Sequence, residues 1–353
     1  MWAKKLTAWY LENQRDLPWR INPSPYKTLI CEFMAQQTQI KTLLPYFTRW
    51  IEQYPSVKDV AVSKEDKILK SWEGLGYYSR ARNLHKTCQI IEKEYGGKIP
   101  NTSSELLKLP GIGPYIAAAI SSISFNESIA VGDGNVLRVI TRLFGLRDDI
   151  TKEKTKQAIQ KRLNREIRNT TPGVFNQAIM ELGALICKPK SPHCELCPIN
   201  SICYANNMNE IEKLPYKPKK APIPHYTIAV GVIRKENGEI LITKRKKDQL
   251  LGGLWEFPGG KVKSGETLEA ALIREIKEEV NLNIYEINKI GKVNHAYSHF
   301  KITMHAFECK SENFSELKCK SADEYKFIKS TEFKDYAFPK ANKVIIENLI
   351  NRG

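Results

Sequence analysis

The sequence lacks long apolar runs, and this absence excludes several classes of protein. None of its 353 residues lies in a stretch that approaches the roughly 18 apolar residues a membrane span requires. The first residues, MWAKKLTAWYLENQ, also lack the uninterrupted apolar segment of a signal peptide. We therefore expect no membrane association and a cytoplasmic, reducing location. Cysteines in that environment are thiols or metal ligands, and disulfides are not expected.

Acidic residues are scarce relative to basic ones, with 39 Asp and Glu against 55 Lys and Arg and a net charge of +16. The excess is uneven. Residues 1–220 hold 33 basic and 21 acidic residues, whereas residues 221–353 hold 22 and 18. A positive N-terminal part favours polyanionic partners such as nucleic acid. A genome rich in Lys codons would produce the same bias, so charge alone leaves both explanations open.

Alternating apolar and polar residues, the pattern of half-buried strands, are scarce before residue 220. Apolar residues there recur at helical spacing instead, as in segments 65–95 and 151–169. Residues 213–226 then combine four prolines with four lysines. This composition excludes a continuing helix and favours a basic, semi-extended linker.

Beyond the linker the pattern changes. Residues 227–233 and 239–245 flank a turn at Asn237–Gly238 and predict a β-hairpin. Helices are expected from about Thr267 to Val280 and over 341–350. We therefore predict a mainly α N-terminal half over 1–212, a basic Pro-rich linker over 213–225 and an α+β domain over 226–353.

Four of the eight cysteines lie close together in a C-x6-C-x2-C-x5-C pattern: Cys187, Cys194, Cys197 and Cys203. Four thiolates in so short a segment indicate a metal centre, and both zinc and a [4Fe–4S] cluster accept four thiolates. Zinc sites usually pair two C-x2-C units, whereas this uneven spacing suits a compact loop around a cubane. Because all four thiolates are used, no iron is left open for substrate. We expect a structural or DNA-facing role for the cluster.

A tight Gly-Ile-Gly turn leads into a helix start in LPGIGPYIAAAI (109–120). The first backbone N–H groups of a helix have no partner within it, so they can hold a phosphate. Gly111 and Gly113 let the backbone approach such a ligand closely. Similar turns join helices in many proteins, but beside the cysteines and the positive charge this one indicates a helix–hairpin–helix that binds DNA.

These features occur together in one known family. Residues 5–203 resemble the helix–hairpin–helix DNA glycosylases with an iron–sulfur loop, and within them the adenine-specific MutY branch. The segments that carry the resemblance are LPWR (17–20), PYKTLICEFMAQQTQI (25–40), WEGLGYYSRARNLHK (72–86), LPGIGPY (109–115), VGDGNVLRV (131–139) and FNQAIMELGALIC (175–187). The resemblance implies a six-helix-barrel subdomain and an iron–sulfur subdomain with its cluster loop at 187–203.

The resemblance also implies an activity. The expected enzyme is a monomer that acts near the nucleoid in base excision repair. Its expected substrate is double-stranded DNA in which adenine is mispaired with 8-oxoguanine or guanine, and it hydrolyses the N-glycosidic bond of that adenine. A DNA-binding module without chemistry is a separate possibility, against which the presence of two suitable carboxyl groups argues.

Glycosidic hydrolysis needs an acid at the leaving group and a carboxylate beside the cationic sugar. By resemblance Glu32 is the acid, and its apolar neighbours favour a raised pKa. Asp133 matches the second carboxylate, and Asn135 would assist it. On the residues alone, Glu32 also suits a partnered core glutamate and Asp133 a helix N-cap. Tyr115 stands where related lyases carry a lysine that forms a Schiff base, so we expect a monofunctional enzyme.

The resemblance assigns further residues to adenine and to DNA. The expected adenine pocket comprises Trp19, Arg20 and Glu181. The expected DNA contacts are Gln36 and Gln37, which fill the gap left by the extruded base, Tyr77, which intercalates, and the glycines Gly111 and Gly113. On sequence alone, Tyr77 is equally compatible with a packed core tyrosine.

Residues 226–350 resemble the Nudix fold, which this family uses to recognise 8-oxoguanine. The segment HAYSHF (295–300) matches the recognition loop, so we assign Tyr297, Ser298 and His299 to the modified base. The Nudix box lacks only its final glycine, which Asn281 replaces, and keeps Gly260, Glu266, Arg274, Glu275, Glu278 and Glu279.

The carboxylates of this box allow two interpretations. Glu275, Glu278 and Glu279 share a helix face and suit Mg²⁺, which prefers oxygen ligands. A box with bound magnesium would hydrolyse nucleoside triphosphates such as 8-oxo-dGTP, as a second activity. Alternatively, the box is a relic whose charges form a solvated helix face. The sequence leaves both interpretations open.

Overall fold

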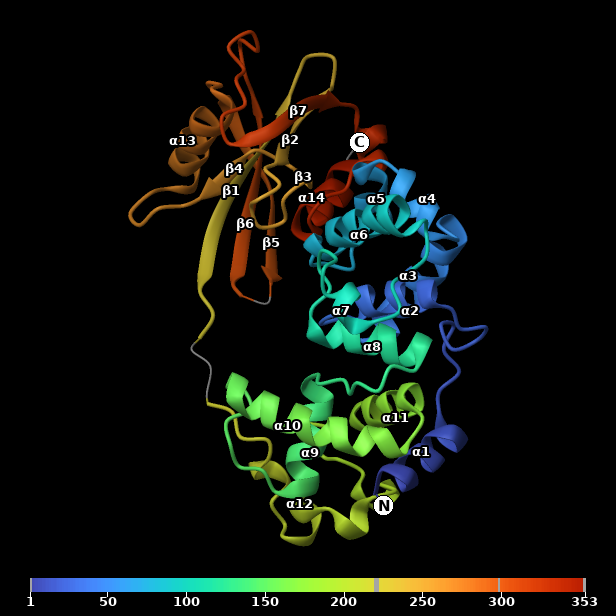
Figure 1. Cartoon of the computed structure of the whole chain (residues 1–353). Coiled ribbons are helices and arrows are strands. Elements are labelled where there is room, and N and C mark those ends of the chain that lie inside the picture. The colour runs from blue at the N-terminus through green and yellow to red at the C-terminus, as the bar shows by residue number, and fades with distance from the viewer. Residues whose placement is uncertain (1, 219–221, 298, 352–353) are drawn as a thin grey trace. The chain divides into compact units, whose positions relative to one another are not determined.

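The computed structural model describes residues 2–218, 222–297 and 299–351. Two compact units make up the chain (Figure 1). Unit 1 comprises residues 1–62 and 83–220, and unit 2 comprises residues 63–82 and 221–353. Segment 63–82 thus groups with the C-terminal residues. The domain boundaries at the Pro-rich linker stay a prediction.

Unit 1 is helical wherever it has regular structure within the described residues. Its longer helices are α1 (Trp2–Asn13), α2 (Pro25–Ala35), α3 (Ile40–Gln53), α4 (Val57–Val62), α6 (Ser79–Tyr95, whose first turn belongs to unit 2), α8 (Pro114–Phe125), α9 (Gly134–Phe144), α10 (Glu153–Glu166) and α11 (Pro172–Leu185). Short elements are α7 (Ser103–Leu106), η1 (Ile167–Asn169), η2 (Cys194–Leu196), η3 (Asn200–Ile202), α12 (Tyr204–Asn207) and η4 (Ile211–Lys213).

Local signals in the sequence explain where these helices begin. Ser24 caps α2, because its hydroxyl accepts the Lys27 N–H, and Pro25 follows as the first helical residue. Proline likewise opens α8 and α11. Apolar side chains of α1, α8, α9 and α11 form one buried core, with Leu6, Ile140 and Phe175 fully enclosed. The mainly α N-terminal half is therefore confirmed.

The helical pattern predicted over 65–95 is wrong in one place. The structure has two helices there, α5 (Glu65–Ser71) and α6, separated by a turn at 72–78. Gly74, Gly76 and Tyr77 all have positive φ, at 96°, 77° and 49°. A helix requires negative φ, so these residues end the first helix, while apolar spacing continues across the turn and conceals the break.

Unit 2 contains, besides α5, one seven-stranded sheet and two longer helices. The strands are β1 (His225–Arg234), β2 (Ile240–Arg245), β3 (Trp255–Glu256), β4 (Gly259–Lys261), β5 (Tyr285–Ala296), β6 (Lys301–Lys310) and β7 (Ala322–Ile328). The helical elements are α13 (Leu268–Val280), η5 (Ser330–Asp335) and α14 (Lys340–Ile350).

The sheet is mixed. Its central order is β3-β2-β1-β6-β5, with β4 paired to β1 and β7 paired to β2. Only the β1–β6 pair is parallel, and its register runs from His225 opposite Lys301 to Arg234 opposite Lys310. This arrangement confirms the predicted α+β domain, and β1 and β2 form the predicted antiparallel hairpin.

Each face of the sheet is covered by one helix. Val230 and Val232 of β1 belong to a core with α14, whereas Ala229 and Ile233 belong to a second core with α13. Because successive side chains of a strand point to opposite faces, the two cores lie on opposite sides of the sheet. Figure 1 shows α13 and α14 on these two sides. No helix among the described residues has the length and apolar character to cross a bilayer.

Candidate active site

Glu32 lies on α2 between fully buried apolar neighbours and has 6% of its surface exposed. Its Oε2 has no hydrogen-bond partner among the described residues. The pKa of Glu32 is raised to about 7, mainly by burial; Tyr115 lowers it in part, and the charge of the nearby Asp133 contributes to the increase. A carboxyl group with this pKa is still protonated in part at neutral pH and can act as an acid.

Asp133 caps the N-terminus of α9. Its Oδ1 accepts the Val136 N–H at 2.7 Å, and its Oδ2 accepts the Asn135 amide at 3.1 Å. Burial raises the pKa of Asp133, whereas these hydrogen bonds lower it and stabilise the ionised form. The cap predicted as the alternative role is therefore present, and it leaves the carboxylate held rigidly beside Glu32.

Arg138 connects this carboxylate to the cysteine loop, and sequence reasoning missed it. Its Nη2 donates to Asn135 Oδ1 and to the Gly183 carbonyl, both at 2.8 Å, and its Nε donates to the Cys187 carbonyl at 2.7 Å. The signal that the sequence offered was an arginine about one helical turn after the G-D-G-N motif. Asn135 is thus anchored on one side by Arg138 and holds Asp133 on the other.

Tyr115 lies in the first turn of α8, where its hydroxyl donates to Met180 Sδ at 3.2 Å. Burial raises the pKa of this phenol well above its ordinary value, and the charges of Glu32 and Asp133 add to the effect. The side chain lies with both carboxyl groups and stays neutral. Since it has no amine, it cannot form a Schiff base.

The expected adenine-pocket residues are joined by a buried ion cluster. Glu181 of α11 has 2% of its side chain exposed and pairs with Arg15 at 2.7 Å and Arg20 at 3.0 Å. Burial alone would raise the pKa of Glu181, but hydrogen bonds from the two guanidinium groups outweigh it and lower the pKa to about 2. Trp19 packs edge-on against Phe47 at 5.2 Å. Arg15, which the sequence did not single out, completes this cluster.

The four predicted cluster cysteines line one pocket, together with Arg142. Burial raises the pKa of Cys197 and Cys203, and the neighbouring thiols raise both further, so the four sulfur atoms share one site. Arg142 donates to Cys187 Sγ at 3.5 Å and to the Lys188 and Pro189 carbonyls. Four thiols around a common pocket, beside a buried cation that would offset thiolate charge, fit an iron–sulfur cluster.

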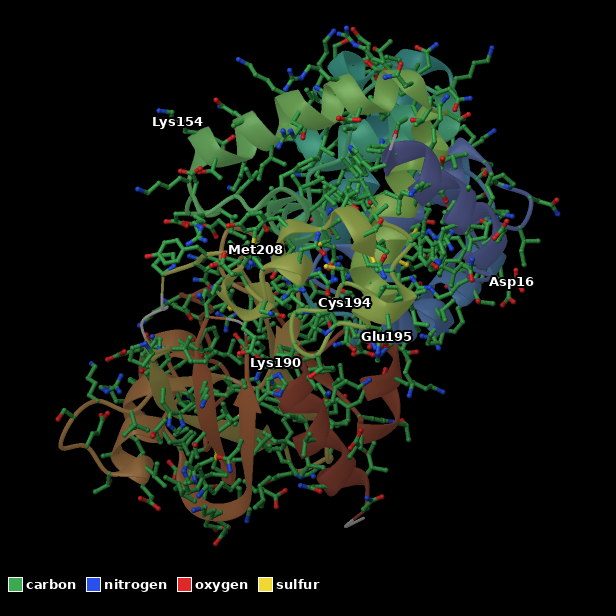
Figure 2. All side chains as sticks on the ribbon, turned by 90° about the horizontal axis from the view of Figure 1, so that it is seen from below. Asp16, Lys154, Lys190, Cys194, Glu195 and Met208 are labelled. Atoms are coloured by element: carbon green, nitrogen blue, oxygen red, sulfur yellow. The ribbon has the colours of Figure 1, made fainter. Side chains whose placement is uncertain are left out.

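The loop between the first two ligands carries positive charge at the surface. Lys190 and His193 are exposed, and Lys188 Nζ lies 3.1 Å from the His193 ring. Figure 2 labels Lys190 on this loop and Cys194 at its end. The exposed positions of Lys190 and His193 suit contact with a phosphate backbone.

The predicted glycine hairpin precedes α8 as expected. Gly111 has a φ of 77°, and a Cβ there would lie 2.6 Å from Asn83 Cβ, so only glycine fits. Gly113 is the N-cap of α8 and has no other atom close to its Cβ position, which leaves room for a ligand. Gln36 ends α2, and Gln37 follows, exposed and with a φ of 54°. A strained, exposed residue after a buried catalytic helix is a common feature of binding sites.

The remaining residues for which the sequence predicts contact with DNA or with the modified base lie in unit 2. A cavity of about 660 Å³ is lined by Tyr77, Arg82, Tyr297 and His299, among others. Tyr297 stacks on Phe300 at 4.8 Å, so its ring shapes the turn between β5 and β6. His299 is exposed, and Ser298 lies outside the described residues.

Arginine holds most of the Nudix-box carboxylates. Arg274 pairs with Glu266 at 2.7 Å, Glu275 at 2.6 Å and Glu278 at 3.2 Å. Burial raises the pKa of Glu279 to about 7. In the part of the chain that the structure describes, no group of three His, Cys, Asp or Glu side chains is arranged to hold a single metal ion. In a cubane, each of the four cysteine thiols would bind a different iron. Their sulfur atoms can therefore lie farther apart than the ligands of a single metal ion. Magnesium at the box stays a prediction.

Family models match three regions of the chain. Residues 30–165 match the HhH-GPD superfamily of base excision DNA repair proteins, residues 187–203 match the iron–sulfur binding domain of endonuclease III, and residues 229–348 match the NUDIX domain. The predicted combination of folds is therefore confirmed, and so is the iron–sulfur character of the cysteine loop.

Curated relatives share one description. Adenine DNA glycosylase of Buchnera aphidicola subsp. Acyrthosiphon pisum is 39% identical over 305 residues, which cover 85% of this chain and 84% of the relative. Adenine DNA glycosylase of Rattus norvegicus is 31% identical over 358 residues and covers 86% of this chain and 69% of the relative.

Solved structures agree with the helical fold. A thermostable thymine-DNA glycosylase is 26% identical with a TM-score of 0.53, covering 58% of this chain and 95% of that chain. A trapped endonuclease III–DNA covalent intermediate is 24% identical with a TM-score of 0.51, covering 59% of this chain and 94% of that chain, and supports the fold alone.

The first prediction concerns the stability of the fold against pH. Burial raises the pKa of Glu32 from 4.5 to about 7, so the native state binds this proton more tightly than the unfolded state. The associated stability is complete below pH 4.5 and is lost as the pH rises to about 7. At pH 8, Glu32→Gln should therefore raise the free energy of unfolding by about 2–3 kcal/mol, and the thermal midpoint should rise with it. At pH 5 the increase should be much smaller. The exposed Glu52→Gln is the control, and equal midpoints for Glu32→Gln and wild type at pH 8 would contradict the raised pKa.

The second prediction concerns Arg138. Arg138→Met removes three hydrogen bonds from buried acceptors and should lower the unfolding free energy by about 2–3 kcal/mol. It should also slow the release of adenine at saturating enzyme by about tenfold, because Asn135 loses its anchor. Calorimetry and single-turnover kinetics measure the two effects, and Arg147→Met, in an exposed ion pair with Glu210, is the matched control. A wild-type rate of release would show that Arg138 serves stability alone.

Proposed function

The chain belongs to the adenine DNA glycosylase family, and we propose that Glu32 and Asp133 are the two carboxyl groups with which it removes adenine. The protein is a DNA N-glycosylase of base excision repair. The observation that carries the assignment is the buried, unpartnered Oε2 of Glu32, whose pKa lies near 7 and which shares its site with the hydrogen-bonded Asp133. The environment of Glu32 favours a protonated acid, and the environment of Asp133 favours an anion that can stabilise positive charge.

The two roles fit one reaction sequence. Glu32 donates its proton to a ring nitrogen of adenine, and the electron pair of the C1′–N9 bond leaves with the base. The sugar becomes an oxocarbenium-like cation, which the Asp133 carboxylate stabilises. Water then adds to C1′, and its proton returns to Glu32. Because Tyr115 offers no amine, we infer a monofunctional enzyme that leaves an intact strand at the abasic site.

The substrate we propose is adenine opposite 8-oxoguanine, and opposite guanine with lower preference. The support is the cavity of unit 2, which Tyr77 lines together with Tyr297, His299 and Phe300. An aromatic ring can stack on a base, and His299 and Arg82 supply polar groups for its edge and backbone. Ser298, in the same turn, is the predicted contact to the modified base. We propose that the enzyme acts as a monomer near the nucleoid.

The four cysteines would hold a [4Fe–4S] cluster, which supplies a compact, rigid support for the basic loop and no open iron. The Arg142 guanidinium donates to Cys187 Sγ, and its charge would stabilise a bound anionic cluster. The basic side chains of Lys188 and Lys190 would then meet the DNA backbone.

A second activity at the Nudix box is less well supported. Arg274 pairs with three of its carboxylates, and the curated relatives carry the adenine glycosylase description. We therefore propose no hydrolysis of nucleotide triphosphates, and the box serves the fold of unit 2.

The third prediction tests the chemistry. Single-turnover incubation with a duplex that holds one 8-oxoguanine·adenine pair should give strand breaks only after hot alkali, and Glu32→Gln should give none. The rate should fall about tenfold per pH unit above pH 7, as Glu32 loses its proton. Breaks without alkali would require a nucleophile other than Tyr115. Release by Glu32→Gln at the wild-type rate would remove Glu32 from the acid role.

The fourth prediction tests recognition of the opposite base. Tyr77→Ala and Ser298→Ala should each reduce the preference for 8-oxoguanine over guanine opposite adenine, by about tenfold for Tyr77 because a stacking contact is lost. The ratio of single-turnover rates on the two duplexes at subsaturating enzyme measures this preference. Tyr325→Ala, an exposed tyrosine of unit 2 that does not line the cavity, is the control. An unchanged ratio in both variants would place recognition elsewhere.

A further inference from the structure

The turn at 72–78, which presents Tyr77, is held by its own side chains. The Trp72 indole N–H donates to the Gly76 carbonyl at 3.1 Å, and the Gly74 N–H donates to the Tyr78 hydroxyl at 3.0 Å. Arg80 donates to the Gly76 carbonyl at 3.0 Å. These bonds stabilise the left-handed backbone at Tyr77.

Glu73 projects from this turn and has 8% of its side chain exposed. Its carboxylate accepts three hydrogen bonds from within unit 2. The Phe338 N–H donates at 2.9 Å, Lys70 Nζ at 2.9 Å and Lys343 Nζ at 3.1 Å. Hydrogen bonds to a poorly hydrated carboxylate are among the stronger ones in proteins. Glu73 is therefore the central acceptor where the turn meets the start of α14.

Further polar contacts surround Glu73 on the same segment. Lys70 also donates to the Tyr336 carbonyl at 2.8 Å, and Arg82 donates to the Gly252 carbonyl. Asp66 pairs with Lys244 at 2.7 Å, with 56% of the Asp66 side chain exposed. These outer contacts are more accessible to water than Glu73, so each contributes less to the position of the turn.

The contacts of Glu73 join two walls of the cavity described above. Tyr77 and Tyr78 line one wall, four and five residues after Glu73, while Pro339 and Lys340 line another, directly after Phe338. The 295–300 turn also lines this cavity. Glu73 does not line it, and it therefore sets the distance between the walls without touching a ligand between them.

We propose that Glu73 is a positioning residue for recognition of the opposite base. Its carboxylate fixes the Tyr77 turn to the start of α14, so that Tyr77, Tyr297 and His299 act on the same base. This inference rests on the proposed recognition of 8-oxoguanine in that cavity. Glu73 takes no part in the chemical step, because it belongs to neither the Glu32 nor the Asp133 site.

Glu73→Gln tests the proposal, because it keeps the side-chain volume and removes the charge. The variant should lose at least about fivefold of the preference for 8-oxoguanine over guanine, measured at subsaturating enzyme. Its rate of adenine release at saturating enzyme should stay within about twofold of wild type. Asp66→Asn, which also removes one carboxylate charge from the same segment, should leave both quantities unchanged. A merely structural role for Glu73 would lower both rates together and leave their ratio intact.

Exchanging the charges of Glu73 and Lys343 provides a second test, which does not require that a single substitution be tolerated. Glu73→Lys should lose the preference, and the double variant Glu73→Lys with Lys343→Glu should recover at least part of it, since the ion pair is restored in reverse. Failure of the double variant to recover more than Glu73→Lys alone would overturn the proposal. Wild-type preference in Glu73→Gln would also overturn it.

Tyr77→Ala in the same assay separates this inference from the proposed function. If Tyr77→Ala loses the preference while Glu73→Gln keeps it, recognition in the cavity stands and the role of Glu73 is wrong. If Tyr77→Ala keeps the preference, the Tyr77 turn takes no part in recognition and the inference about Glu73 fails; if Ser298→Ala keeps the preference as well, the proposed recognition itself fails.

Discussion

The guanidinium of Arg138 is the interaction on which the catalytic half of the molecule depends. It is buried, and it donates to Asn135, to the Gly183 carbonyl and to the Cys187 carbonyl. One side chain thus ties the start of α9, the end of α11 and the first residue of the cysteine loop. Three hydrogen bonds in series, Cys187–Arg138, Arg138–Asn135 and Asn135–Asp133, therefore link the iron–sulfur loop to the proposed catalytic carboxylate without an open iron.

The same residue type has opposite electrostatic behaviour at two neighbouring places. Glu32 and Glu181 are both buried glutamates. Glu181 receives two guanidinium groups and has a pKa lowered to about 2, whereas Glu32 has no cationic partner and a pKa raised to about 7. Burial alone does not decide between structural and catalytic roles. The charged partners set the direction of the shift here, because two guanidinium groups hold Glu181 ionised whereas burial favours the protonated form of Glu32.

Unit 2 uses its carboxylates for cohesion. Arg274 pairs with glutamates of the Nudix box. Glu73 accepts hydrogen bonds from Lys70, Lys343 and the Phe338 N–H. Both sites place the negative charge where donors are already fixed by helices. The result is a sheet domain whose recognition turn and Tyr77 turn line one cavity, with the charged groups that support them lying outside it.

The sequence by itself determined the family, the fold class and most of the candidate site. Motifs such as G-D-G-N and the four-cysteine spacing are local, and local chemistry such as a cap, a metal loop or a glycine turn can be recognised in a few residues. It also predicted α13 and the β1–β2 hairpin, because periodicity and turn residues act over short distances. The break at 72–78 escaped, since apolar spacing continues across residues that the glycines place at positive φ.

Only the tertiary structure decided which charges meet. The sequence assigned no role to Arg15, Arg138 or Glu73, although Glu73 and Arg138 lie in segments that carry the resemblance. Their partners include distant residues: Arg15 and Glu181 are separated by 166 residues, and Glu73 and Lys343 by 270. The pKa of Glu32 likewise depends on the absence of a cation that no local pattern encodes. Burial and the pairing of distant charges are properties of the packed chain, so the sequence could name the reacting groups while the fold set their protonation and support.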